Sequence, residues 1–241
     1  MKTTAGVWWA GVVALGLAVP AQAALQGRLP ATAGGMDYQA YYDTVLDLTW
    51  VADANLAVTN TFGLATNANL GPYPGDPSGV VGFIDAGGVM TWPGARFWID
   101  AMNAADYLGI SNWRLPAALN PDGTGPCFGY DCTGSEMGYM YYTNLGNIAY
   151  PGAGWGLANT APFANLQSNG YWSGTEYGPN PIFAWDFLFY YGDQSVDGKL
   201  SGFDAWAVRP GDVAVPEPAS LGLVATTVGG LLGWGWRRRR R

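Results

Sequence analysis

Apolar and polar residues alternate most regularly between Phe183 and Tyr191, where an aromatic residue occupies every second position. A two-residue period is typical of a β-strand, because successive side chains point to opposite faces. The residues between the aromatic ones are also mostly apolar, with Asp186 the charged exception. Since both faces are hydrophobic, we expect a central strand covered by a helix on one face and by loops on the other.

A second segment repeats its apolar residues with the period of a helix. Thr91 can cap this helix, Pro93 lies in its first turn, and Gly109 is expected to end it. We expect its large apolar residues, Trp98 and Met102, to pack in the core rather than to contact a ligand.

A further helix is expected after a capping box formed by Thr133 and Glu136. Gly146 is expected to end it, and apolar residues recur on one of its faces: Met137, Met140, Tyr141 and Leu145. Residues 41–50 indicate an early strand or hairpin, and residues 59–88 a long surface loop. Residues 112–116 and 205–209 are expected to be short extended segments.

The first 23 residues have the order of a secretory signal peptide. Lys2 precedes an apolar run from Ala5 to Val19, and the small residues Ala21 and Ala23 follow. We expect cleavage after Ala23, with retention as an uncleaved anchor as the alternative.

Residues 219–236 contain no charge, and a helix over them would span about 27 Å, close to the ~30 Å of a bilayer core. Trp234 and Trp236 suit the membrane interface. Arginines resist translocation, so the five that follow are expected to stay cytoplasmic: Arg237, Arg238, Arg239, Arg240 and Arg241. The alternative is a buried helix followed by a basic tail.

Pro216, Glu217 and Pro218 stand just before this apolar segment. The order of Pro-Glu-Pro, apolar span and arginine cluster resembles the PEP-CTERM sorting signal. That resemblance implies recognition by an exosortase, removal of the span, and release or attachment at the surface of a Gram-negative cell. The chain then divides into a signal peptide at 1–23, an exported domain at 24–214 and a sorting signal at 215–241.

Composition narrows what the exported domain can do. It holds five of the chain's 11 basic residues and 17 of its 18 acidic ones, a net charge near −12. Such a surface repels nucleic acid, which we therefore exclude as a partner. The sequence has no histidine, the commonest general base and metal ligand, so we expect neither an enzyme nor a cofactor. A pair of catalytic carboxylates cannot be identified from spacing alone.

Most of the chain from Asp43 to Gly211 looks like the DUF1566 or Lcl C-terminal family. The segments that carry this resemblance are DLTWVADANLA, MTWPGARFWIDAMNAADYLGISNWRLP, GYWSGTEY and AWAVRPG. The resemblance implies an α+β fold related to the C-type-lectin-like and formylglycine-generating-enzyme folds. No reaction is established for the family, and binding or surface roles are usually inferred.

Cys127 and Cys132 lie in the motif CFGYDC. Two cysteines in an exported chain are expected to form a disulfide. The alternative is a copper site, because the pair is similar to the Cu(I)-binding thiolates of formylglycine-generating oxidases. That family, however, carries its pair later in the fold.

Two further segments are candidates for binding. Trp155 stands between glycines and is either an exposed platform for sugar rings or a side chain packed beneath a loop. Asp193, Ser195, Asp197 and Asp204 match positions of a calcium-binding EF-hand loop. The alternative for that segment is a solvated hairpin turn between two strands.

These features predict a noncatalytic exported surface or matrix protein that binds a glycan or another envelope component. Its expected partners are an exosortase, the inner membrane before processing, and extracellular polysaccharide. One alternative is a formylglycine-generating-type copper oxidase that uses Cys127 and Cys132, and another is a structural component of the exopolysaccharide matrix with no discrete ligand.

Overall fold

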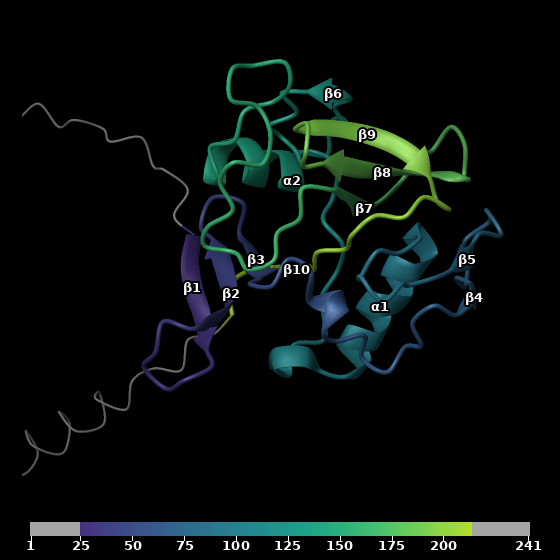
Figure 1. Cartoon of the computed structure of the whole chain (residues 1–241), viewed down its shortest axis with the longest axis horizontal. Helices are drawn as coiled ribbons and strands as arrows, with labels where there is room; N and C mark the ends of the chain where they lie inside the picture. Colours follow the sequence, from purple (N-terminus) through teal and green to yellow (C-terminus); the bar gives the residue numbers. More distant parts are fainter. Residues whose placement is uncertain (1–24, 214–241) are drawn as a thin grey trace, which may run out of the picture.

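Two antiparallel four-stranded sheets dominate the computed structural model, which describes residues 25–213 (Figure 1). The first has the order β1-β2-β3-β10, formed by Leu25–Pro30, Tyr38–Asp43, Leu48–Val51 and Val208–Pro210. The second has the order β6-β9-β8-β7, formed by Gly129–Tyr130, Asp193–Gly198, Phe183–Leu188 and Gly170–Glu176. A small ribbon of β4 (Gly71–Pro72) and β5 (Val81–Gly82) interrupts the long loop. The predicted α+β class and the early hairpin are confirmed.

The first predicted helix is confirmed as α1, Trp92–Ala104. Thr91 caps it, since the Gly94 N–H donates to Thr91 Oγ1 at 3.3 Å. The helix ends before the predicted Gly109, because Asp106 adopts a left-handed conformation with φ of 49°. A 3₁₀ turn, η2 (Tyr107–Gly109), follows, and another, η1 (Leu56–Val58), comes earlier in the chain.

The second helix begins differently from the prediction. It comprises α2, Glu136–Tyr139, and a π-helical turn, η3, Met140–Asn144. Ser135 caps it by accepting the Gly138 N–H at 3.1 Å, so the predicted capping box with Thr133 is wrong. Glu136 instead accepts hydrogen bonds from Arg114 at 2.7 and 2.8 Å. The carboxylate that a capping box would need is therefore engaged in a tertiary ion pair.

The predicted central strand is confirmed as β8, which pairs with β9 on one side and β7 on the other. Its regular part ends at Leu188, and the chain turns before β9 begins at Asp193. The hairpin-turn interpretation of the segment after Asp193 is wrong, because Ser195 pairs with Asp186 within the sheet.

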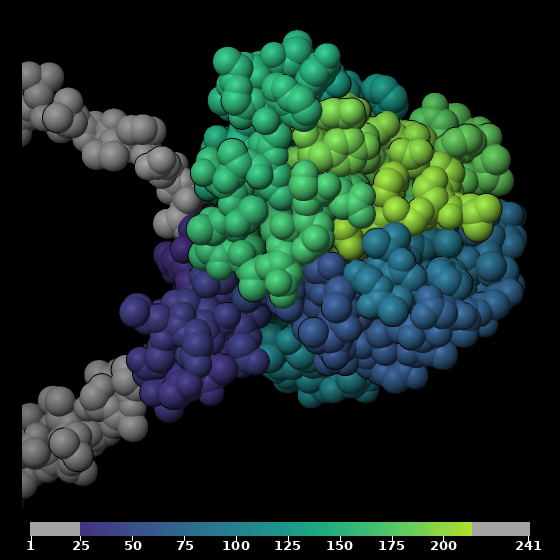
Figure 2. Space-filling model, in the orientation of Figure 1, coloured from purple at the N-terminus to yellow at the C-terminus, as the bar shows by residue number. Residues whose placement is uncertain are grey.

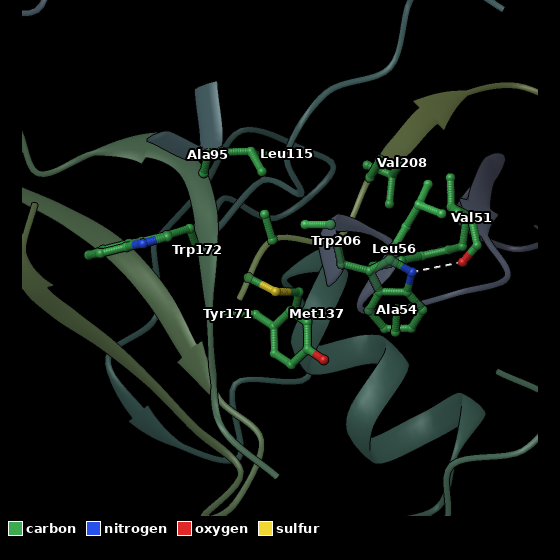
Figure 3. Close-up of a cluster of buried hydrophobic side chains, with 14 of the residues drawn as sticks. Val51, Ala54, Leu56, Ala95, Leu115, Met137, Tyr171, Trp172, Trp206 and Val208 are labelled. Carbon is green, nitrogen blue, oxygen red and sulfur yellow. Dashed lines mark hydrogen bonds between the residues drawn. The ribbon is translucent and has the colours of Figure 1, made fainter. Parts of the chain in front are cut away.

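Buried tryptophans fill the core where the two sheets and α1 meet (Figure 3). The segment from Phe203 to Val208 runs between the two sheets and bridges to Met90, Tyr171 and Arg114. Trp206 Nε1 donates to the Val51 carbonyl at 2.8 Å, which spares a buried indole the cost of losing water.

Within residues 25–213, no helix combines the length and apolar character needed to cross a bilayer. The predicted signal peptide, 1–23, and the predicted membrane segment, 219–236, lie outside the described residues.

Candidate functional site

Four aromatic side chains that are distant in sequence gather at the surface, and we call them the aromatic patch: Tyr130, Tyr150, Trp155 and Tyr191. Their exposed fractions are 42%, 44%, 46% and 37%. The ring of Tyr150 lies 5.2 Å from Trp155, 5.8 Å from Tyr191 and 6.2 Å from Tyr130, measured between centroids. Trp155 is thus part of an exposed cluster and is not packed beneath a loop.

Backbone hydrogen bonds hold the patch in place. The N–H of Tyr150 donates to the Tyr191 carbonyl at 2.9 Å, which joins the loop around residue 150 to the turn after β8. Within that loop, the Gly156 N–H donates to the Ile148 carbonyl at 3.0 Å, and the Tyr141 hydroxyl donates to the same carbonyl at 3.0 Å. Figure 2 shows this green segment protruding beside the yellow-green β8–β9 hairpin. The rings are therefore presented on fixed backbone.

A row of polar residues continues from the patch along β9. Tyr130 is paired with Asp193, so both side chains point to the same face of the sheet. Asp193, Ser195 and Asp197 alternate along β9 and share that face with Asp186, the partner of Ser195. The aromatic patch is therefore bordered by carboxylates.

Asp186 is the most unusual member of this row. Its side chain is fully buried, and neither carboxyl oxygen has a hydrogen-bond partner among the described residues. Burial, and then the charges of Asp197 and Asp193, raise its pKa to about 8. Asp186 is thus mainly protonated and neutral at pH 7.

The calcium interpretation receives no support from this arrangement. Asp204 does not extend the row on β9; it accepts a hydrogen bond from Asn169 Nδ2 at 3.0 Å, and burial raises its pKa to about 6. In the part of the chain that the structure describes, no three acidic or cysteine side chains are grouped so that they could hold a metal ion. Asp193, Ser195 and Asp197 lie on a strand rather than in an EF-hand loop.

A second polar site is a cleft of about 390 Å³ on the outer side of α1. Arg96, Asp100 and Asn103 line it from one face of the helix, and the segment after Trp113 and the end of β7 close it. Its polar side chains are Tyr73, Arg96, Asp100, Asn103, Arg114 and Thr175.

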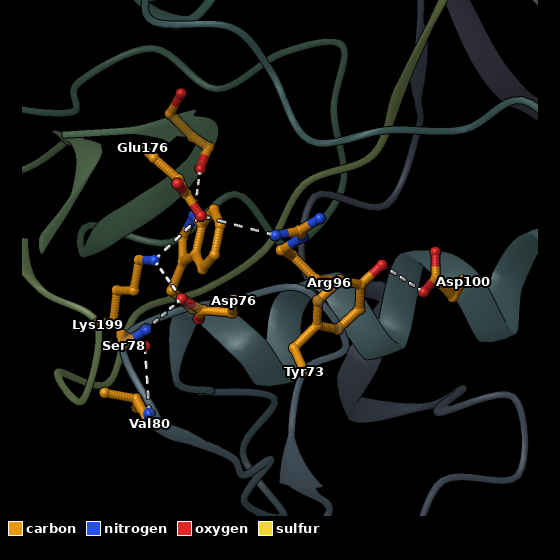
Figure 4. Close-up of polar contacts among 10 residues, drawn as sticks. Tyr73, Asp76, Ser78, Val80, Arg96, Asp100, Glu176 and Lys199 are labelled. Carbon is orange, nitrogen blue, oxygen red and sulfur yellow. Dashed lines mark hydrogen bonds and ion pairs between the residues drawn. The ribbon is translucent and has the colours of Figure 1, made fainter. Parts of the chain in front are cut away.

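A buried ion pair lies beside this cleft (Figure 4). Lys199 Nζ donates to Asp76 Oδ1 at 2.7 Å and to Glu176 Oε1 at 3.1 Å. The side chains of Lys199 and Asp76 have no exposed surface. Burial alone would raise the pKa of Asp76, but the Lys199 and Ser78 hydrogen bonds outweigh it and lower that pKa. No local sequence pattern predicts this cluster, and the one available signal is that Lys199 is the sole lysine between residues 24 and 214.

Cys127 and Cys132 form the predicted disulfide, with their Cα atoms 5.5 Å apart. Among the described residues no free cysteine is left, so this chain offers no pair of thiolates for the copper alternative. Gln194 Nε2 donates to the Cys127 carbonyl at 2.6 Å, which ties the disulfide loop to β9.

The C-terminal site residues fall outside the described residues. These are the sorting residues Pro216, Glu217 and Pro218 and the cluster from Arg237 to Arg241.

Comparison with known proteins addresses this C-terminal part directly. No curated protein and no solved structure matched the chain, so the DUF1566 or Lcl resemblance and the lectin-like fold it implies stay predictions. Residues 214–240 match the family described as the PEP-CTERM protein-sorting motif. This motif indicates an exported protein that an exosortase recognises and that is anchored at the membrane through its C-terminal tail.

Proposed function

We propose that this exported protein is a noncatalytic surface or matrix protein whose body binds a glycan through the aromatic patch. The observation that carries the proposal is the gathering of three exposed rings, Tyr150, Trp155 and Tyr191, with centroids 5.2 to 5.8 Å apart. Exposed aromatic faces of this kind stack on the apolar faces of sugar rings. Packing alone does not account for four half-exposed aromatic rings in one place.

The surroundings of the patch also suit a polyhydroxyl ligand. Asp193 lies on the face of Tyr130, and its Oδ2 can accept a hydrogen bond from a sugar hydroxyl, whereas its Oδ1 is buried. Because the loop around Tyr150 is already bonded to the turn at Tyr191, little conformational entropy is lost when a ligand binds.

Substitution of two patch residues tests this proposal. The full chain with Trp155→Ala and Tyr150→Ala should bind polysaccharides about tenfold or more weakly, since central aromatic contacts dominate such interfaces. Affinity electrophoresis in gels that contain bacterial exopolysaccharides would measure the retardation. Phe83→Ala, which removes another partly exposed ring outside the patch, is the matched control and should migrate like the natural chain. A natural chain that no polysaccharide on a glycan array retains would contradict the proposal.

We propose, in addition, that residues 219–236 cross the inner membrane before processing, with the arginines inside and the body outside. The uncharged length of the segment, the arginines after it and the signal-like N-terminus support the same orientation. Deletion of residues 215–241 should release the protein from the membrane fraction. A variant with Pro216→Ala and Pro218→Ala keeps the apolar segment, so it should stay in the membrane while escaping processing. Membrane retention of the deletion variant would contradict this orientation.

A further inference from the structure

The cleft beside α1 concentrates positive charge in an otherwise acidic body. Residues 25–213 contain five basic side chains and 17 acidic ones. Two of the five, Arg96 and Arg114, line this cleft, and a third, Lys199, contacts Glu176 next to it. Its lining thus includes two cations and one carboxylate, that of Asp100. The lining itself therefore carries more positive than negative charge, in contrast to the acidic row of β9.

Arg96 lies against two aromatic rings beside the cleft. Its guanidinium carbon lies 3.9 Å from the centroid of Tyr73 and 4.8 Å from that of Trp92. Tyr73 is itself fixed, because its hydroxyl donates to Asp100 Oδ2 at 2.6 Å (Figure 4). These cation–π contacts position the guanidinium, and its N–H groups remain the part that can bind.

The two arginines of the cleft differ in how their charge is used. Arg114 is 35% exposed and forms two hydrogen bonds of 2.7 and 2.8 Å with Glu136. Arg96 is equally exposed, at 33%, but its one ion pair within residues 25–213 is a 3.8 Å approach to Glu176. That distance is beyond a hydrogen bond, and Lys199 already engages the same Glu176 oxygen at 3.1 Å. Arg96 is therefore oriented without a bonded carboxylate.

We propose that this cleft binds a carboxylate-bearing saccharide, with the carboxylate seated on the N–H edge of Arg96. A planar guanidinium binds a carboxylate through two parallel hydrogen bonds, which an ammonium group cannot reproduce. Asn103 and Thr175 lie in the same lining and offer polar groups to sugar hydroxyls. The volume of about 390 Å³ falls within the range of small-ligand sites, so the cleft accommodates a short acidic saccharide. This site shares no residue with the aromatic patch.

Titration of the full chain, purified in detergent, with trigalacturonate tests this site. Calorimetry should detect binding, and the methyl-esterified trimer, which lacks the charged carboxylates, should bind at least tenfold more weakly. Arg96→Gln should lose at least tenfold in affinity. Arg96→Lys keeps the charge but not the planar fork, and it should also weaken binding severalfold.

Two control variants separate this site from the rest of the molecule. Arg28→Gln removes a positive charge from β1, where Arg28 pairs with Asp212, and should change the affinity less than twofold. Met36→Ala, at an exposed position outside the cleft and outside the aromatic patch, should likewise leave trigalacturonate binding unchanged. The inference is overturned if the natural chain binds no trigalacturonate at millimolar concentration, or if Arg96→Gln, with an unchanged melting temperature, binds as well as the natural chain. Equal binding of the esterified trimer would overturn it as well.

Discussion

Asp186 is acidic by type, yet the fold keeps it mainly neutral. Its pKa in an unfolded chain is near 3.9, whereas burial and the neighbouring Asp197 and Asp193 raise it to about 8 in the folded state. Between these two values the folded protein binds a proton that the unfolded chain has released. The free energy of unfolding therefore falls as the pH rises through that window. Asp204, with a pKa raised to about 6, adds a smaller effect of the same sign at lower pH.

Asp186→Asn is predicted to remove this pH dependence, because the amide keeps the shape of the protonated acid and cannot ionise. The stability of the variant relative to the natural chain should be about 3–4 kcal/mol greater at pH 8 than at pH 5. Thermal unfolding between pH 5 and pH 9 measures it. Asp106→Asn, at an exposed position, is the control: its stability relative to the natural chain should be the same at pH 5 and at pH 9. A relative stability of Asp186→Asn that is the same at pH 5 and at pH 8 would contradict the raised pKa.

Secondary-structure elements with strong local signals were predictable from the sequence. Thr91 and Pro93 mark the start of α1, and the aromatic alternation after Phe183 marks β8. Each signal is carried by residues that are close together in the sequence and belong to the element itself. β1, which pairs with β2, was not anticipated. The start of α2 was mispredicted because Glu136 pairs with Arg114, a residue from another element.

The corrected start of α2 makes a testable distinction between two nearby hydroxyl residues. Ser135→Ala removes the hydroxyl that accepts the Gly138 N–H and should lower the free energy of unfolding by about 1 kcal/mol. Thr133→Ala, which would be the damaging change in a capping box, should stay within about 0.5 kcal/mol of the natural chain. Denaturant unfolding of both variants compares them directly. A larger loss of stability for Thr133→Ala than for Ser135→Ala would support the capping box instead.

At the scale of the whole molecule, both proposed binding sites are assembled from distant parts of the chain. Trp155 could be singled out by its flanking glycines, but Tyr130 and Tyr191 join it only through the pairing of β6 with β9 and the turn after β8. The cleft likewise needs Tyr73 from the long loop to lie against Arg96 of α1. Sequence periodicity reports on neighbours within one element, so neither assembly could be read from it.

Lys199 ties three of these distant parts together, since it follows β9 and bonds Asp76 of the long loop and Glu176 of β7. Lys199→Met is predicted to lower the free energy of unfolding by about 3–5 kcal/mol, because it leaves Asp76 buried and unpaired. Adding Asp76→Asn to that variant should recover part of the loss. Denaturant unfolding measures both. If Lys199→Met alone were as stable as the natural chain, the ion pair would not hold these parts together.

Both ends of the described chain lie at the same sheet. Leu25 begins β1 and Val213 follows β10, the two outer strands of that sheet, and Arg28 clamps Asp212 with contacts of 2.7 and 2.8 Å. The aromatic patch belongs to the other sheet and its loops. If the C-terminal tail tethers the body while a ligand pulls on the patch, the tension must pass from one sheet to the other. The segment from Lys199 to Trp206 is the covalent link along that path, and its packing in the core is what would bear the load.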